Sequence, residues 1–84
     1  MEQRTFVCEL LSIYKTLLTK TQYDIMSDFY LLDLTQSEIA ENKEVSRQSI
    51  NDCITLCTER LLQLEKDLKV KAMQDLLATA KIYL

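Results

Sequence analysis

Polar side chains suited to base recognition follow one another closely in the middle of this chain. Arg47, Gln48 and Asn51 are residue types that make paired hydrogen bonds to purine edges in a DNA major groove. Thr55 lies one helical turn beyond Asn51, on the same face of a helix. Together with Ser46 just before them, these residues are the candidate nucleic-acid contacts: Ser46, Arg47, Gln48, Asn51 and Thr55.

The charges around these residues oppose a polyanion. Between residues 35 and 60 the chain has three basic and five acidic side chains, a net charge of −2, whereas phosphate contacts normally come from Lys or Arg. The whole chain carries a net charge of −3. We therefore favour a solvated or protein-binding surface here, and nucleic-acid binding is the alternative.

The three cysteines offer little metal or redox chemistry. Cys53 and Cys57 lie four residues apart, Cys8 is the third thiol, and the chain has no histidine. A structural zinc site takes about four such ligands, so we expect no metal site and interpret the pair as buried apolar groups. An odd number of cysteines without disulfide-like spacing indicates a reducing, cytoplasmic location.

Catalysis is not expected either. The chain contains neither histidine nor glycine, so general acid–base chemistry would depend on scattered carboxylates, and a glycine-rich phosphate loop is excluded. Glu38 is better explained as part of a helix cap. The sequence therefore predicts a non-enzymatic protein with no catalytic residues and no cofactor.

The composition predicts the kind of fold that must position these residues. The chain has 84 residues, 48% of them apolar, which suits one domain, residues 1–84, with a modest core. Without Gly and Pro, helices are uninterrupted and tight β-hairpins are disfavoured. We expect an all-α fold. No apolar run approaches the roughly 20 residues of a membrane span, and we expect neither a signal peptide nor membrane insertion.

Hydroxyl residues mark where helices begin. Thr35 with Glu38 forms a capping box, and Thr19 with Gln22 forms another. Ser46 precedes a new apolar period, where an N-cap is needed. These caps and the apolar spacing predict four helices. Three cover about residues 5–18, 20–31 and 47–68, and a short one begins after residue 35.

The segment from Thr35 to Ile54 has the layout of a helix-turn-helix. Ile39 and Ala40 form a small apolar pair suited to a close helix crossing, and Val45 is placed to fill the angle between the two helices. We therefore expect residues 1–68 to form a helical bundle around this motif.

The apolar pattern changes direction near residue 69. The stripe that begins at Ile50 reaches Leu68, and a second stripe begins at Val70 on another side of the helix. This change predicts a bend or short turn between Asp67 and Lys71. Residues 69–84 would then form a long C-terminal helical extension of the bundle.

These long stripes have more apolar surface than a helix-turn-helix needs to bury. Either the C-terminal segment folds back over them, or they form a homodimer interface or a groove for a partner protein, and heptad spacing does not choose between the alternatives. The candidate interface residues are Leu61, Leu62, Leu64, Leu68, Met73 and Leu77.

Two stretches of the chain resemble a known family. F-Y-L-L-D-L-T-Q-S-E-I-A and V-S-R-Q-S-I-N-D are similar to the YlxM-type helix-turn-helix proteins of low-GC Gram-positive bacteria and mycoplasmas. The resemblance implies a winged-helix-like or sigma region-four-like bundle. It also implies a component or regulator of the signal recognition particle pathway, which targets proteins. The alternative role is a DNA-binding transcriptional regulator.

The resemblance also bears on individual positions. Ser46, Arg47 and Gln48 match the motif that opens the family's recognition helix. Thr55 and Leu56 stand where the family tends to have a basic pair. This difference weakens nucleic-acid binding, so we expect a protein partner first and nucleic acid second.

Overall fold

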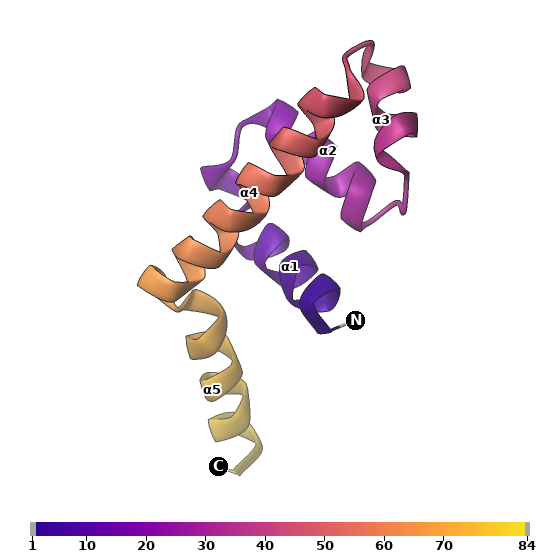
Figure 1. Cartoon of the computed structure of the whole chain (residues 1–84). Coiled ribbons are helices and arrows are strands. Elements are labelled where there is room, and N and C mark those ends of the chain that lie inside the picture. Colours follow the sequence, from indigo (N-terminus) through magenta and orange to yellow (C-terminus); the bar gives the residue numbers. More distant parts are fainter. Residues whose placement is uncertain (1, 84) are drawn as a thin grey trace.

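A computed structural model of the chain describes the backbone of residues 2–83 and the side chains of residues 4–77. Residues 2–83 form helices and connections without any strand, which confirms the all-α expectation (Figure 1). The elements are α1 (Glu2–Ile13), the 3₁₀ turn η1 (Lys15–Leu17), α2 (Lys20–Tyr30), α3 (Gln36–Lys43), α4 (Arg47–Leu68) and α5 (Val70–Tyr83). In this part of the chain, every helix is too short or too polar to cross a membrane.

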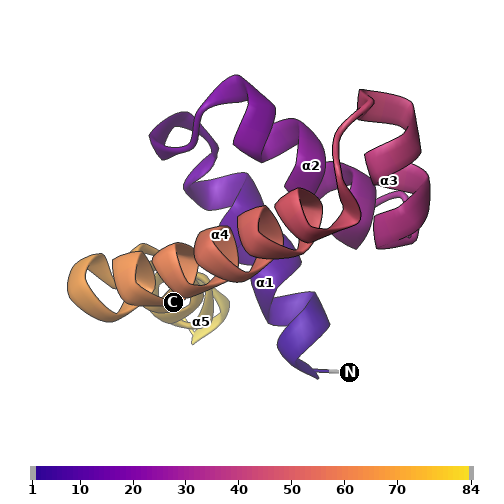
Figure 2. The same ribbon diagram turned by 45° about the horizontal axis from the view of Figure 1, so that its top comes forward.

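The core lies between the inward faces of the first four helices. Helix α4 contacts α1, α2 and α3 and packs across all three (Figures 1 and 2). Its buried residues repeat every three or four positions, as the apolar stripe predicts. The buried core residues are Val7, Leu10, Leu11, Tyr14, Leu18, Ile25, Met26, Ile39, Ala40, Ile50, Ile54, Cys57 and Leu61.

The first helix ends earlier than its apolar spacing predicts. A helix was expected over residues 5–18, but α1 ends at Ile13 and a 3₁₀ turn follows. Thr19 is extended (φ −68°, ψ 161°), because its side chain accepts the N–H of Gln22 at 3.1 Å as the cap of α2. Unwinding ahead of this cap leaves Leu17 45% exposed, while Leu18 still reaches the core.

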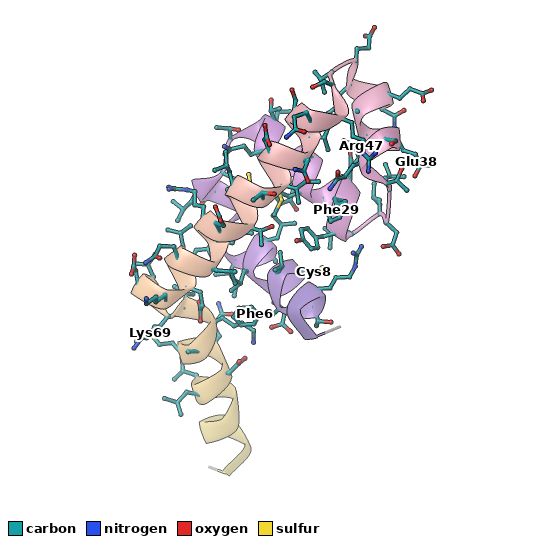
Figure 3. The ribbon with its side chains drawn as sticks, in the orientation of Figure 1. Phe6, Cys8, Phe29, Glu38, Arg47 and Lys69 are labelled. Carbon is teal, nitrogen blue, oxygen red and sulfur yellow. The ribbon has the colours of Figure 1, made fainter. Side chains whose placement is uncertain are left out.

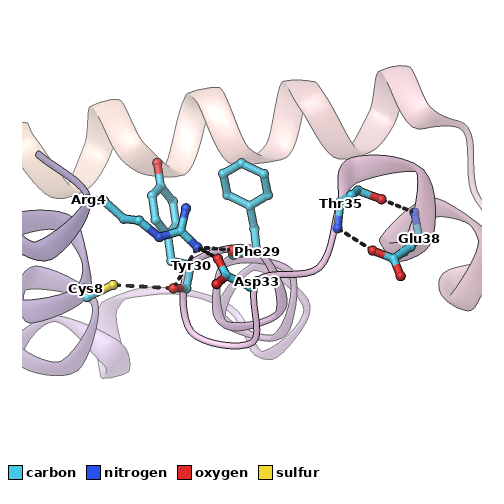
Figure 4. A network of polar contacts seen from close by, with 7 residues as sticks. All are labelled: Arg4, Cys8, Phe29, Tyr30, Asp33, Thr35 and Glu38. Atoms are coloured by element: carbon cyan, nitrogen blue, oxygen red, sulfur yellow. Dashed lines mark hydrogen bonds and ion pairs between the residues drawn. The ribbon is translucent and has the colours of Figure 1, made fainter. Parts of the chain in front are cut away.

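Helices α3 and α4 form the predicted helix-turn-helix. The Thr35 hydroxyl accepts the N–H of Glu38 at 3.1 Å, and the Glu38 carboxylate accepts the N–H of Thr35 at 2.8 Å (Figure 4). Ser46 caps α4 by accepting the N–H of Ser49 at 3.0 Å. These contacts confirm both predicted caps of the motif.

The turn between α3 and α4 is closed by backbone contacts. Glu44 ends α3 in the left-handed conformation (φ 56°), and the Val45 N–H donates to the Ala40 carbonyl at 3.0 Å. The Val45 side chain is 46% exposed, so the expectation that it fills the angle between the helices is wrong. Ile39 and Ala40 are 0% and 6% exposed and make the crossing instead.

A bend separates α4 from α5, as the change of stripe predicts. Lys69 takes the left-handed conformation (φ 55°) between Leu68 and Val70. Helix α5 then leaves the bundle and contacts α1 near its own start (Figure 1). The molecule is consequently elongated, measuring 52 × 22 × 20 Å.

Side chains from two other helices hold the start of α5. The Glu65 carboxylate accepts the N–H groups of Lys71 and Ala72, each at 3.1 Å, and the Tyr14 hydroxyl at 2.8 Å. The Tyr14 hydroxyl in turn accepts the N–H of Val70 at 3.3 Å. Otherwise unpaired N–H groups of the first turn are therefore satisfied by α1 and α4.

Candidate functional site

The five predicted polar residues all lie on the outside of the bundle. Ser46, Arg47, Gln48, Asn51 and Thr55 are exposed, whereas the intervening apolar residues of α4 face the core. Figure 3 shows Arg47 at the start of α4, beside α3. Ser46 is occupied as the cap of α4, so its hydroxyl contributes to the helix rather than to a free surface.

Two shallow depressions continue into each other on this side of α4. One, of about 300 Å³, is lined by Gln36, Arg47, Gln48 and Asn51. The other, of about 380 Å³, is lined by Asn51, Asp52, Thr55 and Leu56. Because Asn51 belongs to both, they form one surface, here called the α4 face: Gln36, Arg47, Gln48, Asn51, Asp52, Thr55 and Leu56.

Hydrogen bonds within the protein hold the polar groups of the α4 face in place. The Gln36 side-chain amide donates to the Asn51 side-chain carbonyl at 3.2 Å and so joins α3 to α4. One turn along, the Gln48 amide donates to the Asp52 carboxylate at 2.8 Å. Side chains fixed in this way lose less entropy when a partner binds.

Gln36 is a member of the α4 face that the sequence analysis missed. It is the first residue of α3, directly after the Thr35 cap. The capping box gave its position in the helix, but only the crossing of α3 and α4 brings it to Asn51. The first residue after a recognised cap is a reasonable place to look for such contacts.

The α4 face combines opposite charges with an apolar group. Arg47 provides a cation, and Asp52 places a carboxylate in the middle of the surface. Leu56 is 65% exposed at one end. The Asp52 carboxylate repels a phosphate backbone, and the Leu56 side chain makes no favourable contact with one. Both groups suit a protein partner, whose surface is also mixed.

Arg4 connects α1 to the end of α2. Its guanidinium donates to the carbonyls of Phe29 and Tyr30 at 2.9 and 3.1 Å and pairs with Asp33 (Figure 4). It also lies over both aromatic rings, 5.8 and 5.5 Å from their centroids. Since these carbonyls end α2, Arg4 fixes the connection that leads into α3.

The thiols behave as core groups. The sulfur atoms of Cys53 and Cys57 are 3.9 Å apart, and Cys57 is 2% exposed. Burial, together with the neighbouring Cys53, raises the pKa of the Cys57 thiol to about 12. Such a thiol stays protonated at neutral pH, and the thiolate is the form that reacts or binds metals. Among the described side chains, no three His, Cys, Asp or Glu residues are grouped to hold a metal ion.

The six predicted interface residues fall into different environments. Leu61 is 0% exposed and belongs to the bundle's own core, and Leu64 is partly buried against it. Leu62 is 36% exposed, whereas Leu68, Met73 and Leu77 are 51%, 63% and 62% exposed. The exposed apolar surface of this set therefore lies on α5 and at the end of α4. Leu76 of α5, which is 69% exposed, was not predicted.

Helices α3 and α4 are joined by a short turn, and α4 has an exposed polar face. This arrangement defines a helix-turn-helix protein. The chain belongs to the UPF0122 family, described as "Putative helix-turn-helix protein, YlxM / p13 like", whose model matches residues 1–83. The family resemblance noted from the sequence is therefore confirmed.

Individual relatives support this membership. A UPF0122 protein of Clostridium acetobutylicum is 43% identical over 70 residues, which are 83% of this chain and 60% of the relative. One from Clostridium perfringens strain SM101 is 39% identical over 75 residues, 89% and 67% of the two chains. One from Ureaplasma urealyticum serovar 10 is 40% identical over 68 residues, 81% and 69% of the two chains. The chain thus spans 60 to 69% of the length of these curated relatives. No solved structure matches it.

Proposed function

We propose that this protein is a non-enzymatic regulator that binds a protein component of the signal recognition particle pathway through the α4 face. The observation that carries the proposal is the character of that face, which is exposed, fixed by internal hydrogen bonds, mixed in charge and apolar at one end. The pathway itself comes from the family resemblance. Free thiols support a cytoplasmic site of action.

The chemistry of the α4 face favours a protein over a nucleic acid. Of its seven residues only Arg47 carries a positive charge to form an ion pair with a phosphate, and Asp52 repels one. Leu56 supplies apolar contact area that a phosphate backbone cannot use. A protein partner can instead cover Leu56 and pair a basic group with Asp52.

Binding to the particle protein, its receptor and the particle RNA, each measured separately, tests this role. We expect a protein component to bind, and Leu56→Ala to weaken that binding at least about tenfold, because it removes the apolar contact area of the α4 face. Leu31→Ala is the matched control, because Leu31 is similarly exposed (53%) at the end of α2. If none of the three components binds, the proposed pathway is wrong.

A second candidate function is a DNA-binding transcriptional regulator. It is favoured by the position of Arg47, Gln48 and Asn51, which begin the second helix of the motif and point outward. That is where helix-turn-helix proteins read base edges.

Titration with duplex DNA at low and physiological salt separates the two candidates. With few phosphate contacts available, we expect weak binding that physiological salt removes. Tight, sequence-selective binding that Arg47→Ala abolishes would instead establish the DNA-binding role and overturn our order of preference.

A further inference from the structure

One side of α5 is apolar and strongly exposed. Met73, Leu76 and Leu77 are 63%, 69% and 62% exposed, and at about 100° per residue they fall within one third of the helix circumference. This set of three residues is here called the α5 face. Ala72 is also exposed at its edge. The described residues of the α5 face carry no charge.

The described charges of α5, Lys71 and Asp75, lie on its other side, toward α1. The Lys71 ammonium is 2.6 Å from the Glu9 carboxylate and 2.7 Å from the Asp75 carboxylate. These two contacts hold the pKa of Lys71 above its ordinary value. Lys71 is therefore bound to α1 of the bundle, and the α5 face lies on the side of the helix opposite to Lys71.

A helix of this length needs more support than the bundle gives it. Helix α5 has 14 residues, about 21 Å at 1.5 Å per residue, and isolated helices of about this length are marginal in water. Its start is held by Glu65, Tyr14 and Glu9, while the side chains of residues 72–77 are exposed and the ribbon continues away from the bundle (Figure 1). Covering the α5 face would supply the missing stabilisation.

We propose that a second copy of this chain covers the α5 face, with the two α5 helices packed antiparallel. An uncharged face can pair with itself without burying a charge or opposing like charges. A phosphate-bearing partner, whether a nucleic acid or a lipid surface, would need cationic side chains that the α5 face does not provide.

The antiparallel arrangement follows from the shape and charge of the molecule. Figure 1 shows that α5 points away from the bundle. Two copies packed antiparallel along α5 would therefore place their bundles at opposite ends of the pair. Each chain has a net charge of −3, so this separation also reduces repulsion. The dipoles of the two helices are opposed, which is favourable.

The area involved predicts a weak dimer. Two helices of this length bury on the order of 1,000 Å² in total, which is the lower end for specific interfaces. We expect dissociation constants in the range of about 10 to 100 μM, with monomer and dimer both measurable at ordinary concentrations.

Sedimentation of the full chain over concentrations that span this range tests the proposal. The unmodified protein should shift from monomer to dimer as concentration rises. Leu77→Glu should weaken the dimer at least tenfold, because it places a charge inside the apolar contact. Gln74→Glu adds the same charge on the side of α5 that faces Glu9 and Lys71. It should change the dissociation constant of the dimer by no more than about twofold.

Two results would overturn the proposal. One is a monomer at every concentration, and the other is a dimer that Leu77→Glu and Gln74→Glu affect equally, which would assign the contact to another surface. Circular dichroism of both variants checks that the bundle remains folded. Neither result bears on binding through the α4 face, so the two proposals fail separately.

Discussion

At the level of single residues, Glu65 connects three helices. Its carboxylate, on α4, is bonded to the Tyr14 hydroxyl of α1 and to the N–H groups of Lys71 and Ala72 at the start of α5. Burial by itself would raise the pKa of Glu65, but these hydrogen bonds outweigh it and lower the pKa. The ionised form of Glu65 is therefore stabilised by folding.

This lowered pKa predicts acid sensitivity. The stabilisation by Glu65 is present above its unfolded pKa of about 4.3 and is lost as the pH falls through the lower folded value. The free energies of unfolding in urea of the unmodified protein and of Glu65→Gln should therefore differ at pH 7 by about 1 to 3 kcal/mol. This difference should shrink in strong acid. A difference that does not change with pH would contradict this role.

The exposure of a site residue was predictable where it depends on the rotation of a single helix. Arg47, Gln48, Asn51 and Thr55 face outward because the spacing of the buried residues in α4 fixes that helix's rotation. Gln36 and Glu65 were not predictable, since their contacts depend on how neighbouring helices cross.

At the level of elements, hydroxyl caps determine where α2, α3 and α4 begin. Thr19 and Thr35 each form the reciprocal contacts of a capping box, and Ser46 caps α4. Because these contacts are local in sequence, they could be predicted from the chain alone. The end of α1 could not, since Tyr14 and Leu18 keep the apolar spacing even though the helix has already unwound between them.

Removing the cap of α3 should weaken the whole bundle. Thr35→Ala leaves the N–H of Glu38 without its partner, and we expect a loss of about 1 kcal/mol in the free energy of unfolding. Thr21→Ala, at an exposed position inside α2, is the control and should change stability by less than about 0.5 kcal/mol. Urea titration monitored by circular dichroism gives both values, and equal losses would show that the cap is dispensable.

At the level of the whole molecule, α4 supports the bundle along most of its length. Leu61 is fully buried there, while its neighbour Leu62 is 36% exposed. We therefore expect Leu61→Ala to reduce the free energy of unfolding by about 2 to 5 kcal/mol and Leu62→Ala by much less. Thermal and urea unfolding measure both. Similar losses for the two variants would contradict the assignment of Leu61 to the core.

The direction of α5 is the part of the architecture that the sequence left open. The change of apolar stripe predicted the bend, and the structure places it at Lys69. Apolar spacing predicts that one face of the helix is covered, but it does not identify the covering group. Fold-back of the C-terminal segment and self-association with a second copy were therefore equally compatible with it. The contact of Lys71 with Glu9 in α1 decides where α5 starts and leaves the α5 face exposed.

Three of the helix connections share a backbone feature that has a mechanical consequence. Asp33, Glu44 and Lys69 all take positive φ angles, of 61°, 56° and 55°, at positions where proteins usually place glycine. A residue with a Cβ atom has a much narrower choice of backbone angles than glycine, so each connection is a stiff joint. With a stiff joint at Lys69, α5 would act as a spacer of fixed direction. A dimer joined through α5 would then hold its two α4 faces a set distance apart, and so would select partners by the spacing of their binding sites.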